Sequence, residues 1–292
     1  MALYTLAQAA KLGLDDLQTG LAETVITVSD FVSMLPVVTT SGNAYVFNRE
    51  SVLIDGQLIA ADGTITDSTA LEHDKVSLAL QGISGQYDVL GIQMAQGIGA
   101  NAGQDPQTVA LQSAAKGIAR KFEALTQTGT VVANNFDGLD AAVTAFGAGQ
   151  IVDGAAAALS FAMLDEGKSK VVSKGRQVDF VMGNSNSENK IKALMRTAGG
   201  VSMMELNGRQ FVSYDGVPFI RNDYMANGVI YFGNWEEGTK DGVAMVVPEG
   251  NLFVADPAIV LEGKDATRFR LKMYATLACH NKRGLARVED FT

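Results

Sequence analysis

Hydrophobic and polar positions change their period several times along the chain. In the first 42 residues, apolar side chains recur at helical spacing, which predicts short helices. From Asn43 to Gly91 they fall in short strand-like runs, separated by the turn pairs Asp55-Gly56 and Asp62-Gly63. This second pattern predicts a long β-hairpin that projects from the body of the protein.

The strongest helical pattern follows the predicted hairpin. Asp105 fits an N-cap and Pro106 fits the first helical position. Apolar residues then recur at spacings of three and four until Gly129. The spacing predicts one helix of about 20 residues, or ~30 Å at 1.5 Å per residue.

The rest of the chain mixes helical and strand patterns, which predicts an α+β fold. We expect helices over residues 139–146 and 161–172, and a third that begins at Ser185 and uses Glu188 in a capping box. From Gly208 onward the pattern is mainly strand and turn. The last long strand alternates, and one set of its side chains is predicted to face the core: Phe269, Leu271, Met273, Ala275, Leu277 and Cys279.

The composition is rich in apolar residues, and the chain carries a negative net charge. Charged residues make up 19% of the chain and hydrophobic residues 47%, so we expect apolar surface to remain after the core is filled. Burial against other subunits would cover that surface. The formal net charge of −9 argues against a sequence-independent nucleic-acid binder, which needs a surplus of Lys and Arg.

Candidate chemistry is sparse. The chain has one cysteine, Cys279, and two histidines, His73 and His280, so an internal disulfide and most metal sites or catalytic triads are excluded. Cys279 falls on the apolar face of the last strand, and we expect it in the core. We expect neither histidine to anchor a site. The pair Glu236-Glu237 is interpreted as part of a solvated turn.

The chain shows no targeting or membrane segment. Its first residues lack the basic and apolar regions of a signal peptide, which favours a cytosolic origin. The longest apolar stretch, residues 141–164, is interrupted by Gln150 and Asp153 and falls short of the ~20 residues of a membrane helix. We therefore expect a soluble protein without a membrane partner.

Two glycine-containing strings imitate nucleotide-binding loops. Gly97–Gly103 precedes the long helix and supports a competing hypothesis, a nucleotide-binding enzyme. The segment before it does not have a buried-strand pattern, and Asp105 puts a carboxylate where a phosphate would lie. The string at 167–169 follows a helix rather than a strand. We interpret these strings as a linker and a helix end, and predict no catalytic residue, cofactor or metal.

Three local strings carry a resemblance to a known family: GNAYVFNRE at 42–50, FDGL at 136–139 and GVPFIRND at 216–223. Together with the order of the predicted elements, they resemble the major capsid proteins of tailed bacteriophages, the Hong Kong phage capsid fold. The resemblance runs nearly from end to end of the chain. It implies six segments: an N-terminal arm (1–42), an extended loop (43–91), a linker and spine helix (92–129), a peripheral domain (130–200), an axial domain (201–265) and C-terminal strands that return to the peripheral domain (266–292).

The resemblance implies a structural protein rather than an enzyme. Such a protein self-assembles as pentamers and hexamers into an icosahedral shell around a double-stranded DNA genome, without sequence-specific DNA binding. It would be assembled in the host cytoplasm and located in the virion, with scaffold, decoration and portal proteins as further partners. The same fold also serves encapsulin nanocompartments, which package enzymes, and this is the alternative function.

Candidate contacts between subunits come from two sets of residues. The first set is apolar and lies in the arm, where burial in the chain's own core is the alternative: Leu17, Leu21, Val25, Phe31 and Leu35. The second set pairs an acidic loop with basic residues of a neighbour: Asp55, Asp62 and Asp67 over Lys116, Arg120 and Lys121 of the spine helix, or over Lys190, Lys192 and Arg196 of the peripheral helix.

Some family members join their subunits by a Lys–Asn isopeptide bond, and this chain is predicted not to. Between Arg49 and Gly91 the only lysine is Lys75, which lies on the return strand, while the loop is rich in carboxylates. Nearby carboxylates keep an amine protonated and non-nucleophilic. The sequence therefore predicts a non-covalent shell.

Overall fold

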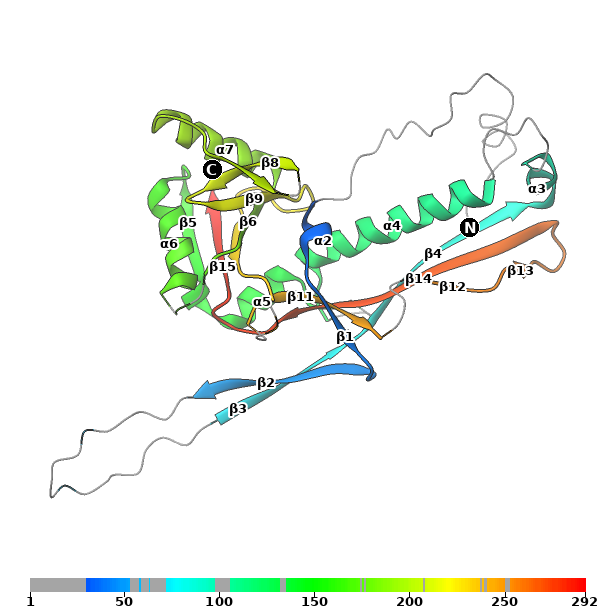
Figure 1. The fold of residues 1–292 in the computed structure, drawn as a ribbon, viewed down its shortest axis with the longest axis horizontal. Helices are drawn as coiled ribbons and strands as arrows, with labels where there is room; N and C mark the ends of the chain where they lie inside the picture. Colours follow the sequence, from blue (N-terminus) through cyan, green and yellow to red (C-terminus); the bar gives the residue numbers. More distant parts are fainter. Residues whose placement is uncertain are drawn as a thin grey trace.

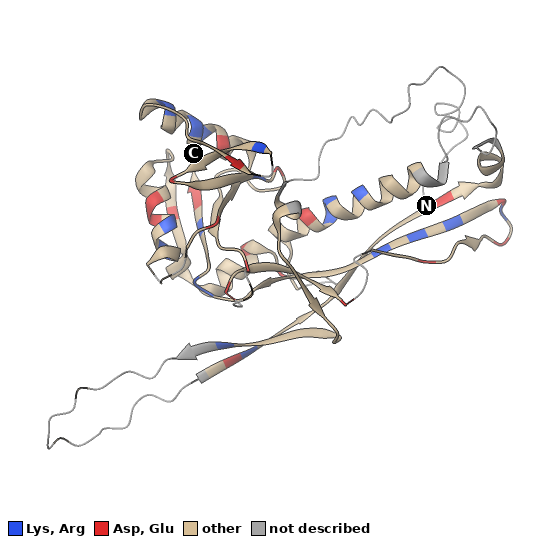
Figure 2. Cartoon of the chain, viewed as in Figure 1, with Lys and Arg blue, Asp and Glu red and all other residues tan. Residues whose placement is uncertain are grey.

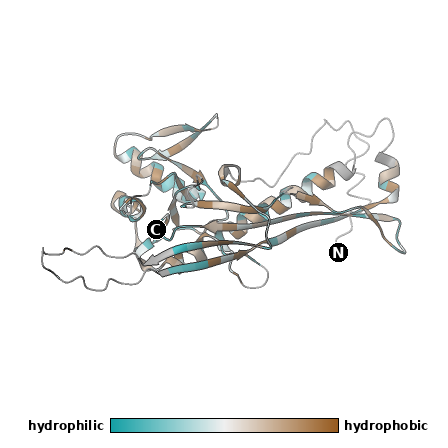
Figure 3. Ribbon diagram, turned by 60° about the horizontal axis from the view of Figure 1, so that its bottom comes forward, coloured by the Kyte–Doolittle hydropathy of each residue, from teal (hydrophilic) through white to brown (hydrophobic). Residues whose placement is uncertain are grey.

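The structure is a computed structural model of the chain. Its elements form two large sheets, a separate two-stranded hairpin and the helices that cover them (Figure 1). The hairpin and the short helix α3 lie at opposite ends of the molecule (Figures 1 and 3). The residues described are 30–52, 58, 63, 72–97, 106–131, 135–173, 175, 177–206, 208–236, 238, 241–249 and 253–292.

A long antiparallel ribbon is the centre of the first sheet. Its strands β4 (Gln81–Leu90) and β14 (Ala266–Cys279) pair without a bulge along the whole of β4. Hydrophilic and hydrophobic residues alternate along β14, as the sequence predicts (Figure 3). The other side of β14 carries three short strands, and a fourth strand pairs in parallel with the first of them: β11 (Val243–Pro248), β12 (Phe253–Ala255), β13 (Ile259–Val260) and β1 (Val37–Thr40).

The second sheet has seven strands in the order β5-β15-β10-β6-β9-β8-β7. Its middle strands are buried on both faces, which explains their continuous apolar runs. The seven strands are β5 (Ile151–Ala157), β6 (Phe180–Gly183), β7 (Met203–Leu206), β8 (Arg209–Tyr214), β9 (Val217–Arg221), β10 (Ile230–Gly233) and β15 (Leu285–Phe291).

The projecting hairpin consists of β2 (Ala44–Val52) and β3 (Glu72–Ala79). They pair antiparallel from Ala44 opposite Ala79 toward the tip. The next strand, β4, leaves the hairpin and pairs with β14. The hairpin is thus shorter than the predicted range of 43–91, because the alternating pattern of β4 belongs to a half-buried strand of the body.

The predicted spine helix is α4 (Pro106–Thr128), which lies along the ribbon (Figure 1). It lies directly over β4, where a Cβ added at Gly85 would be 3.2 Å from the Cβ of Ala114. The remaining helices are α2 (Asp30–Met34), α3 (Gly91–Gly97), α5 (Leu139–Phe146), α6 (Phe161–Val172), α7 (Ser185–Thr197) and the 3₁₀ turn η1 (Ala148–Gln150).

The N-terminus of α7 differs from the prediction by one residue. Asn184 is the N-cap, because its side-chain oxygen accepts a hydrogen bond from the Ser187 amide at 2.8 Å and its backbone is extended. Ser185 is therefore the first helical residue rather than the cap. Glu188 pairs with Lys192 at 2.5 Å, one turn further along the helix.

Two hydrophobic cores lie on opposite faces of the seven-stranded sheet. Along β6 the side chains alternate between them: Phe180 and Met182 join the first core and Val181 joins the second. The first core also contains the inner faces of α4, α5 and β14, so it connects the ribbon to the sheet. The second core lies under α6 and α7.

The seven-stranded sheet contains strands from both sides of the predicted boundaries at 200 and 265. The seven-stranded sheet takes β5 and β6 from the predicted peripheral domain, β7 to β10 from the predicted axial domain, and β15 from the C-terminal segment. β6 pairs with both β9 and β10, so the sheet joins residues on the two sides of position 200. The boundaries of the peripheral and axial domains stay predictions.

The described part of the glycine-rich string does not support a nucleotide loop. The segment before it is the helix α3, where a phosphate-binding loop requires a strand. Its remaining residues, 98–103, lie outside the described residues. Among the residues described, no cluster of three or more His, Cys, Asp or Glu could hold a metal ion, and no helix is long and apolar enough to cross a membrane.

Candidate interaction site at the base of the hairpin

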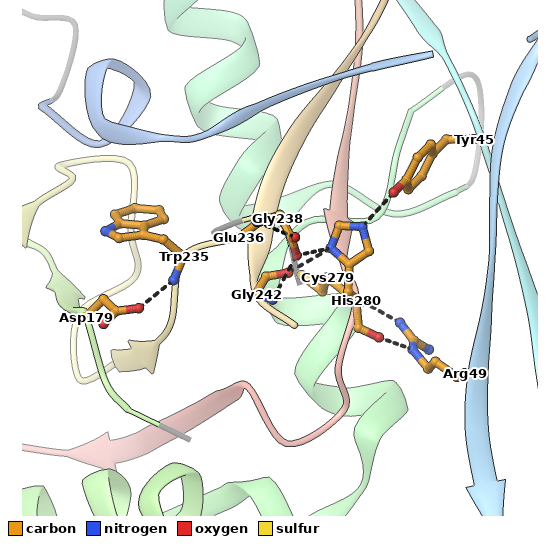
Figure 4. A network of polar contacts seen from close by, with 9 residues as sticks. All are labelled: Tyr45, Arg49, Asp179, Trp235, Glu236, Gly238, Gly242, Cys279 and His280. Atoms are coloured by element: carbon orange, nitrogen blue, oxygen red, sulfur yellow. Dashed lines mark hydrogen bonds and ion pairs between the residues drawn. The ribbon is translucent and has the colours of Figure 1, made fainter. Parts of the chain in front are cut away.

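Polar contacts around His280 hold the base of the hairpin against the body (Figure 4). The His280 side chain follows β14 and is 1% exposed. Its Nε2 lies 2.9 Å from the hydroxyl of Tyr45 in β2. Its Nδ1 lies 3.0 Å from the carbonyl oxygen of Gly242 and 3.2 Å from Oε2 of Glu236. One imidazole ring thus connects the hairpin to the loop that precedes β11.

These partners fix the tautomer of the neutral ring. Two oxygen acceptors face Nδ1 of His280, so Nδ1 carries the proton. Nε2 then has a free lone pair and accepts a hydrogen bond from the Tyr45 hydroxyl. The contact is therefore directional, and it positions β2 relative to the end of β14.

Glu236 holds the loop in the conformation that meets His280. Its two carboxylate oxygens accept hydrogen bonds from the amides of Gly238 at 3.0 Å and Gly242 at 3.2 Å. Position 242 has no room for a side chain, since a Cβ there would lie 2.2 Å from the carbonyl carbon of Trp235. Glu236 is buried, so the prediction of a solvated turn is wrong at this residue: its charge is stabilised by amide donors.

Arg49 is the second anchor of the hairpin. Its Nε donates to the carbonyl oxygen of His280 at 2.7 Å, and its Nη2 donates to that of Cys279. The guanidinium also lies over the rings of Phe47 and Phe146, 5.3 and 5.2 Å from their centroids. Burial lowers the pKa of Arg49, and the nearby carboxylate of Asp74 opposes that shift. Hydrogen bonds from a charged donor of this kind contribute about 1.5–3 kcal/mol.

Two further contacts complete the base. The ring of Phe47 in β2 packs 4.8 Å from the His280 ring, and its side chain is buried. On the other strand, Asp74 pairs with Lys282 at 3.2 Å in an exposed position. The Phe47 contact removes apolar surface from water, whereas the Asp74–Lys282 pair is a surface ion pair that contributes little to stability.

The same loop also holds the segment that enters from the N-terminus. Trp235 stacks on Phe180 at 4.1 Å and contacts Phe31 of α2 at 5.6 Å. The Trp235 amide donates to Asp179 at 2.9 Å. Trp235, Glu236 and Gly242 therefore lie between two segments, with α2 on one side and the hairpin on the other (Figure 4).

The order Tyr45–His280–Glu236 has the form of a nucleophile, a base and an orienting carboxylate, but its environment opposes catalysis. Burial and the charge of Glu236 both raise the pKa of Tyr45, which disfavours the phenolate. The imidazole is almost fully covered, so a substrate has no access to it. Burial also raises the pKa of the Cys279 thiol to about 12. The arrangement is suited to holding a strand in place.

The predicted arm residues fall into two groups. Phe31 and Leu35 are buried in the first core, so they pack within their own chain rather than against a neighbour. Leu17, Leu21 and Val25 lie outside the described residues.

The predicted acidic residues Asp55, Asp62 and Asp67 also lie outside the described residues. The predicted basic residues lie on two helices (Figure 2). On α4, Lys116 and Lys121 are exposed and Arg120 is half-buried.

On α7, two of the three predicted basic residues make contacts within the chain. Lys190 lies 5.1 Å from the ring centroid of Phe291, and Lys192 pairs with Glu188. Arg196 is exposed in the last turn of the helix. On α4, Lys116 and Lys121 are both exposed, whereas on α7 Arg196 is the exposed one of the three predicted basic residues.

Sequence reasoning missed the residues that hold the hairpin. Tyr45, Phe47 and Arg49 alternate along one strand, and this period of two was the available signal that they share a face. No signal in the sequence connects them to His280 or Glu236, which lie about 190 residues or more further along the chain. The buried imidazole of His280, with three polar neighbours, positions the hairpin, and the sequence analysis did not predict this structural role.

Comparison with known proteins gives a clear result for the fold only. No protein-family model matches the sequence, and no curated protein matches it. Solved structures match over nearly the whole chain. A holo-encapsulin complex from Synechococcus elongatus aligns with a TM-score of 0.75 at 17% identity, covering 100% of this chain and 96% of that chain.

Two capsid structures align similarly. The capsid of Cyanophage A-1(L) gives a TM-score of 0.74 at 16% identity, covering 99% of both chains. The capsid of a native GTA particle aligns with a TM-score of 0.70 at 12% identity, covering 100% of both chains. The chain therefore has the α+β fold of tailed-phage major capsid proteins, in agreement with the sequence resemblance.

Proposed function

We propose that this chain is a structural shell protein, which self-assembles into the icosahedral capsid that encloses the double-stranded DNA genome of a tailed phage. The observation that carries the proposal is the firmly anchored hairpin, which projects from a body with the capsid fold (Figure 1). A projecting pair of strands buries little surface in its own chain and therefore suits contact with another subunit.

The anchor at His280 gives this hairpin a mechanical role. Tyr45 and Arg49 fix its base to the end of β14, so a force on the hairpin is transmitted to the ribbon and to α4. In a shell, many such contacts of modest strength add to a stable closed lattice. No catalytic step is required for this function.

The contacts between subunits are proposed to be non-covalent. The acidic loop residues Asp55, Asp62 and Asp67 would lie over basic residues of a neighbour, and the exposed Lys116 and Lys121 of α4 are the best placed of the candidates. Lys75 is exposed on β3, opposite Asn48, and lies at the return strand rather than at the tip. Exposed ion pairs contribute ~0.2–1 kcal/mol each, so assembly should weaken with salt.

Electron microscopy of the purified protein, with and without a co-expressed scaffold protein, tests the function. Closed shells of uniform size are the expected result. Discrete monomers under every condition of salt, pH and concentration would overturn it. Denaturing electrophoresis of the shells tests the non-covalent contacts: a single band at the monomer mass is expected, and a ladder of multimers contradicts the claim.

An encapsulin-like compartment is the second candidate function, and a specific observation favours it. The encapsulin complex aligns with the whole chain at a TM-score as high as that of the cyanophage capsid. The two functions differ in cargo. Shells isolated from the native source should contain nuclease-protected DNA of uniform length under the first proposal, and a co-purifying protein without DNA under the second.

The location and further partners follow from the proposed function. A phage shell would be assembled in the host cytoplasm and located in the virion, and it would meet scaffold, decoration and portal proteins. The names peripheral and axial describe positions about a symmetry axis of the shell. They stay predictions until a shell is seen.

A further inference from the structure

Two neighbouring residues before β11 contact two different parts of the chain. The ring of Trp235 lies 5.6 Å from that of Phe31 in α2. Oε2 of Glu236 lies 3.2 Å from Nδ1 of His280, the ring that bonds to Tyr45 of the hairpin. Figure 4 shows the Trp235 ring on one side of this stretch and His280 on the other. The contacts to α2 and to the base of the hairpin thus start from adjacent residues.

On the α2 side, Phe31 determines the space that the Trp235 ring can occupy. Phe31 is fully buried, and its ring lies 6.0 Å from that of Phe180, on which Trp235 stacks at 4.1 Å. The three rings pack as one group in the first core. A smaller side chain at position 31 would leave a cavity, and surrounding groups partly relax into a cavity of this kind. The position of the Trp235 ring therefore depends on α2.

On the hairpin side, the backbone of Trp235 lies directly against that of Gly242. A Cβ at position 242 would lie 2.2 Å from the carbonyl carbon of Trp235. The carbonyl oxygen of Gly242 accepts a hydrogen bond from the backbone amide of His280 at 3.1 Å and faces its Nδ1 at 3.0 Å. Close-packed groups transmit a displacement to one another, and N–H···O bonds weaken beyond ~3.2 Å. A shift of Trp235 therefore changes the contacts of His280.

We propose that Trp235, Glu236 and Gly242 couple α2 to the hairpin, so that each of these two elements is held more firmly while the other is in place. Each element has two states: docked, as in this structure, and locally open. Because coupling between two equilibria is reciprocal, an open α2 favours an open hairpin base by the same factor as the reverse. The inference concerns the single subunit and does not rest on the proposed shell function.

Coupling of this kind gives the hairpin a control point inside its own chain. A contact that pulls on α2 would loosen the base of the hairpin, and a contact that holds α2 would fix it. The anchored hairpin of this structure is then one of two states of the molecule, and α2 biases the choice between them.

A second route also connects α2 to the hairpin. The chain runs from α2 through β1 into β2, and β1 pairs in parallel with β11 from Val37 opposite Met245. The Met245 amide also donates to the carbonyl oxygen of Pro36 at 2.8 Å. These backbone bonds hold β1 in place along the way, so a displacement of α2 is stopped there before it reaches β2. The route along β1 does not use Glu236, and variants at Glu236 therefore distinguish the two routes.

Amide hydrogen exchange of the full-length, unassembled protein tests the coupling. Phe31→Leu stays apolar but removes the ring contact with Trp235, and it should accelerate exchange of the β2 and β3 amides about 5-fold or more. Ile191→Val is the matched control, because Ile191 is fully buried in the second core, on the opposite face of the seven-stranded sheet. Both variants should lower the melting temperature by a few degrees, and Ile191→Val should leave exchange of the hairpin unchanged.

The reverse direction has its own reporter. The Leu35 amide donates to the carbonyl oxygen of Phe31 at 3.0 Å and closes α2. Tyr45→Phe removes the hydroxyl that bonds to His280, and it should accelerate exchange of the Leu35 amide several-fold.

Glu236→Gln tests the route. Glutamine has nearly the same size but one acceptor oxygen in place of two, so it cannot accept from the amides of both Gly238 and Gly242. In the Glu236→Gln background, Phe31→Leu should change exchange of the hairpin by less than about 2-fold. Glu205→Gln, at an exposed position of β7, is the control and should keep the full effect of Phe31→Leu.

Three results would overturn the inference. Equal acceleration of hairpin exchange in Phe31→Leu and Ile191→Val would reduce the effect to a loss of global stability. Unchanged exchange of the Leu35 amide in Tyr45→Phe would show that the two elements open independently. A full effect of Phe31→Leu in the Glu236→Gln background would assign the coupling to β1. A failure to form shells would overturn the proposed function alone, since every measurement here uses unassembled subunits.

Discussion

Two tyrosine hydroxyls stand at the centres of two polar networks, and the networks hold different parts of the molecule. Tyr45 bonds to His280 and fixes the projecting hairpin to the body. Tyr231, in β10, accepts a hydrogen bond from Gln127 near the end of α4 at 3.0 Å and lies 3.4 Å from Asp140 of α5. The first network joins a peripheral element to the body, and the second joins the elements of the body to one another.

Burial distinguishes the two tyrosines. Tyr231 is fully buried within the first core, where burial and Asp140 raise its pKa. Tyr45 is half-buried, and the strands beyond it leave the body. Asp140 also pairs with Arg287 of β15, which in turn bonds to Glu289 at 2.5 Å. Loss of the second network should therefore unfold the chain, whereas loss of the first should release the hairpin from a folded body.

The largest expected effect is at Tyr231. Tyr231→Ala removes a fully buried ring and should lower the free energy of unfolding by about 3–5 kcal/mol. Tyr231→Phe keeps the ring but leaves the buried amide of Gln127 without this acceptor, and should cost about 1–3 kcal/mol. Urea unfolding followed by circular dichroism measures both. A Tyr231→Ala protein as stable as the wild type would show that this network does not hold the body together.

The next effect is at Gly242, which belongs to the loop between the two anchored segments. Gly242→Ala places a Cβ against the backbone of Trp235 and should cost about 1–3 kcal/mol through overpacking. Both Phe31 and Tyr45 depend on this loop, so the amides of α2 and of the hairpin should exchange faster together. Gly149→Ala is the control, because its added Cβ meets no atom within 4 Å. Faster exchange in the hairpin alone would contradict the shared role of the loop.

The contrast between the two networks also explains what the sequence could predict. The helix 106–128 and the strand 266–279 were predictable, because each has one long periodic pattern and buries one regular face. The end of the hairpin at Ala79 was not, since β4 has the same alternation as the hairpin strands. Alternation reports a half-buried strand and does not identify its partner.

The polar anchors were hidden from sequence reasoning for a related reason. A histidine or glutamate in a single sequence looks the same whether it is solvated or buried, and only a distant partner decides which. Glu236 is stabilised by amides of its own loop and by His280, and Tyr45 completes the group from the other end of the chain. These contacts depend on the assembled tertiary fold. The capsid-like order of elements was predictable, and the anchor within it was not.

A smaller and local effect is expected at Arg49. Arg49→Ala removes two charge-assisted hydrogen bonds at the base of the hairpin, and should make the amides of β2 and β3 exchange about 10- to 100-fold faster. The free energy of global unfolding should change little, because the two cores are untouched. Hydrogen exchange with mass spectrometry measures the amide exchange rates, and urea unfolding measures the free energy of unfolding. Arg196→Ala is an exposed control that should change neither, and a large loss of global stability in Arg49→Ala would refute the division into two roles.

The smallest expected effect is that of Arg49→Ala on the rate at which a thiol reagent labels Cys279, the one cysteine of the chain. The Cys279 side chain belongs to the first core with Tyr231, although its carbonyl oxygen accepts from Arg49. Burial raises the pKa of the Cys279 thiol to about 12, so its labelling by a thiol reagent should be slow at pH 7. The labelling rate should rise ~10-fold per pH unit and continue to rise well beyond pH 9, whereas the rate for an exposed thiol levels off near that pH. Because release of the hairpin leaves the core closed, and because the Arg49 charge favours the thiolate, Arg49→Ala should not label faster than the wild type. Tyr231→Ala should label faster, since the core opens more often. Rapid labelling in Arg49→Ala at pH 7 would mean that the hairpin covers the core, and that the two networks act as one.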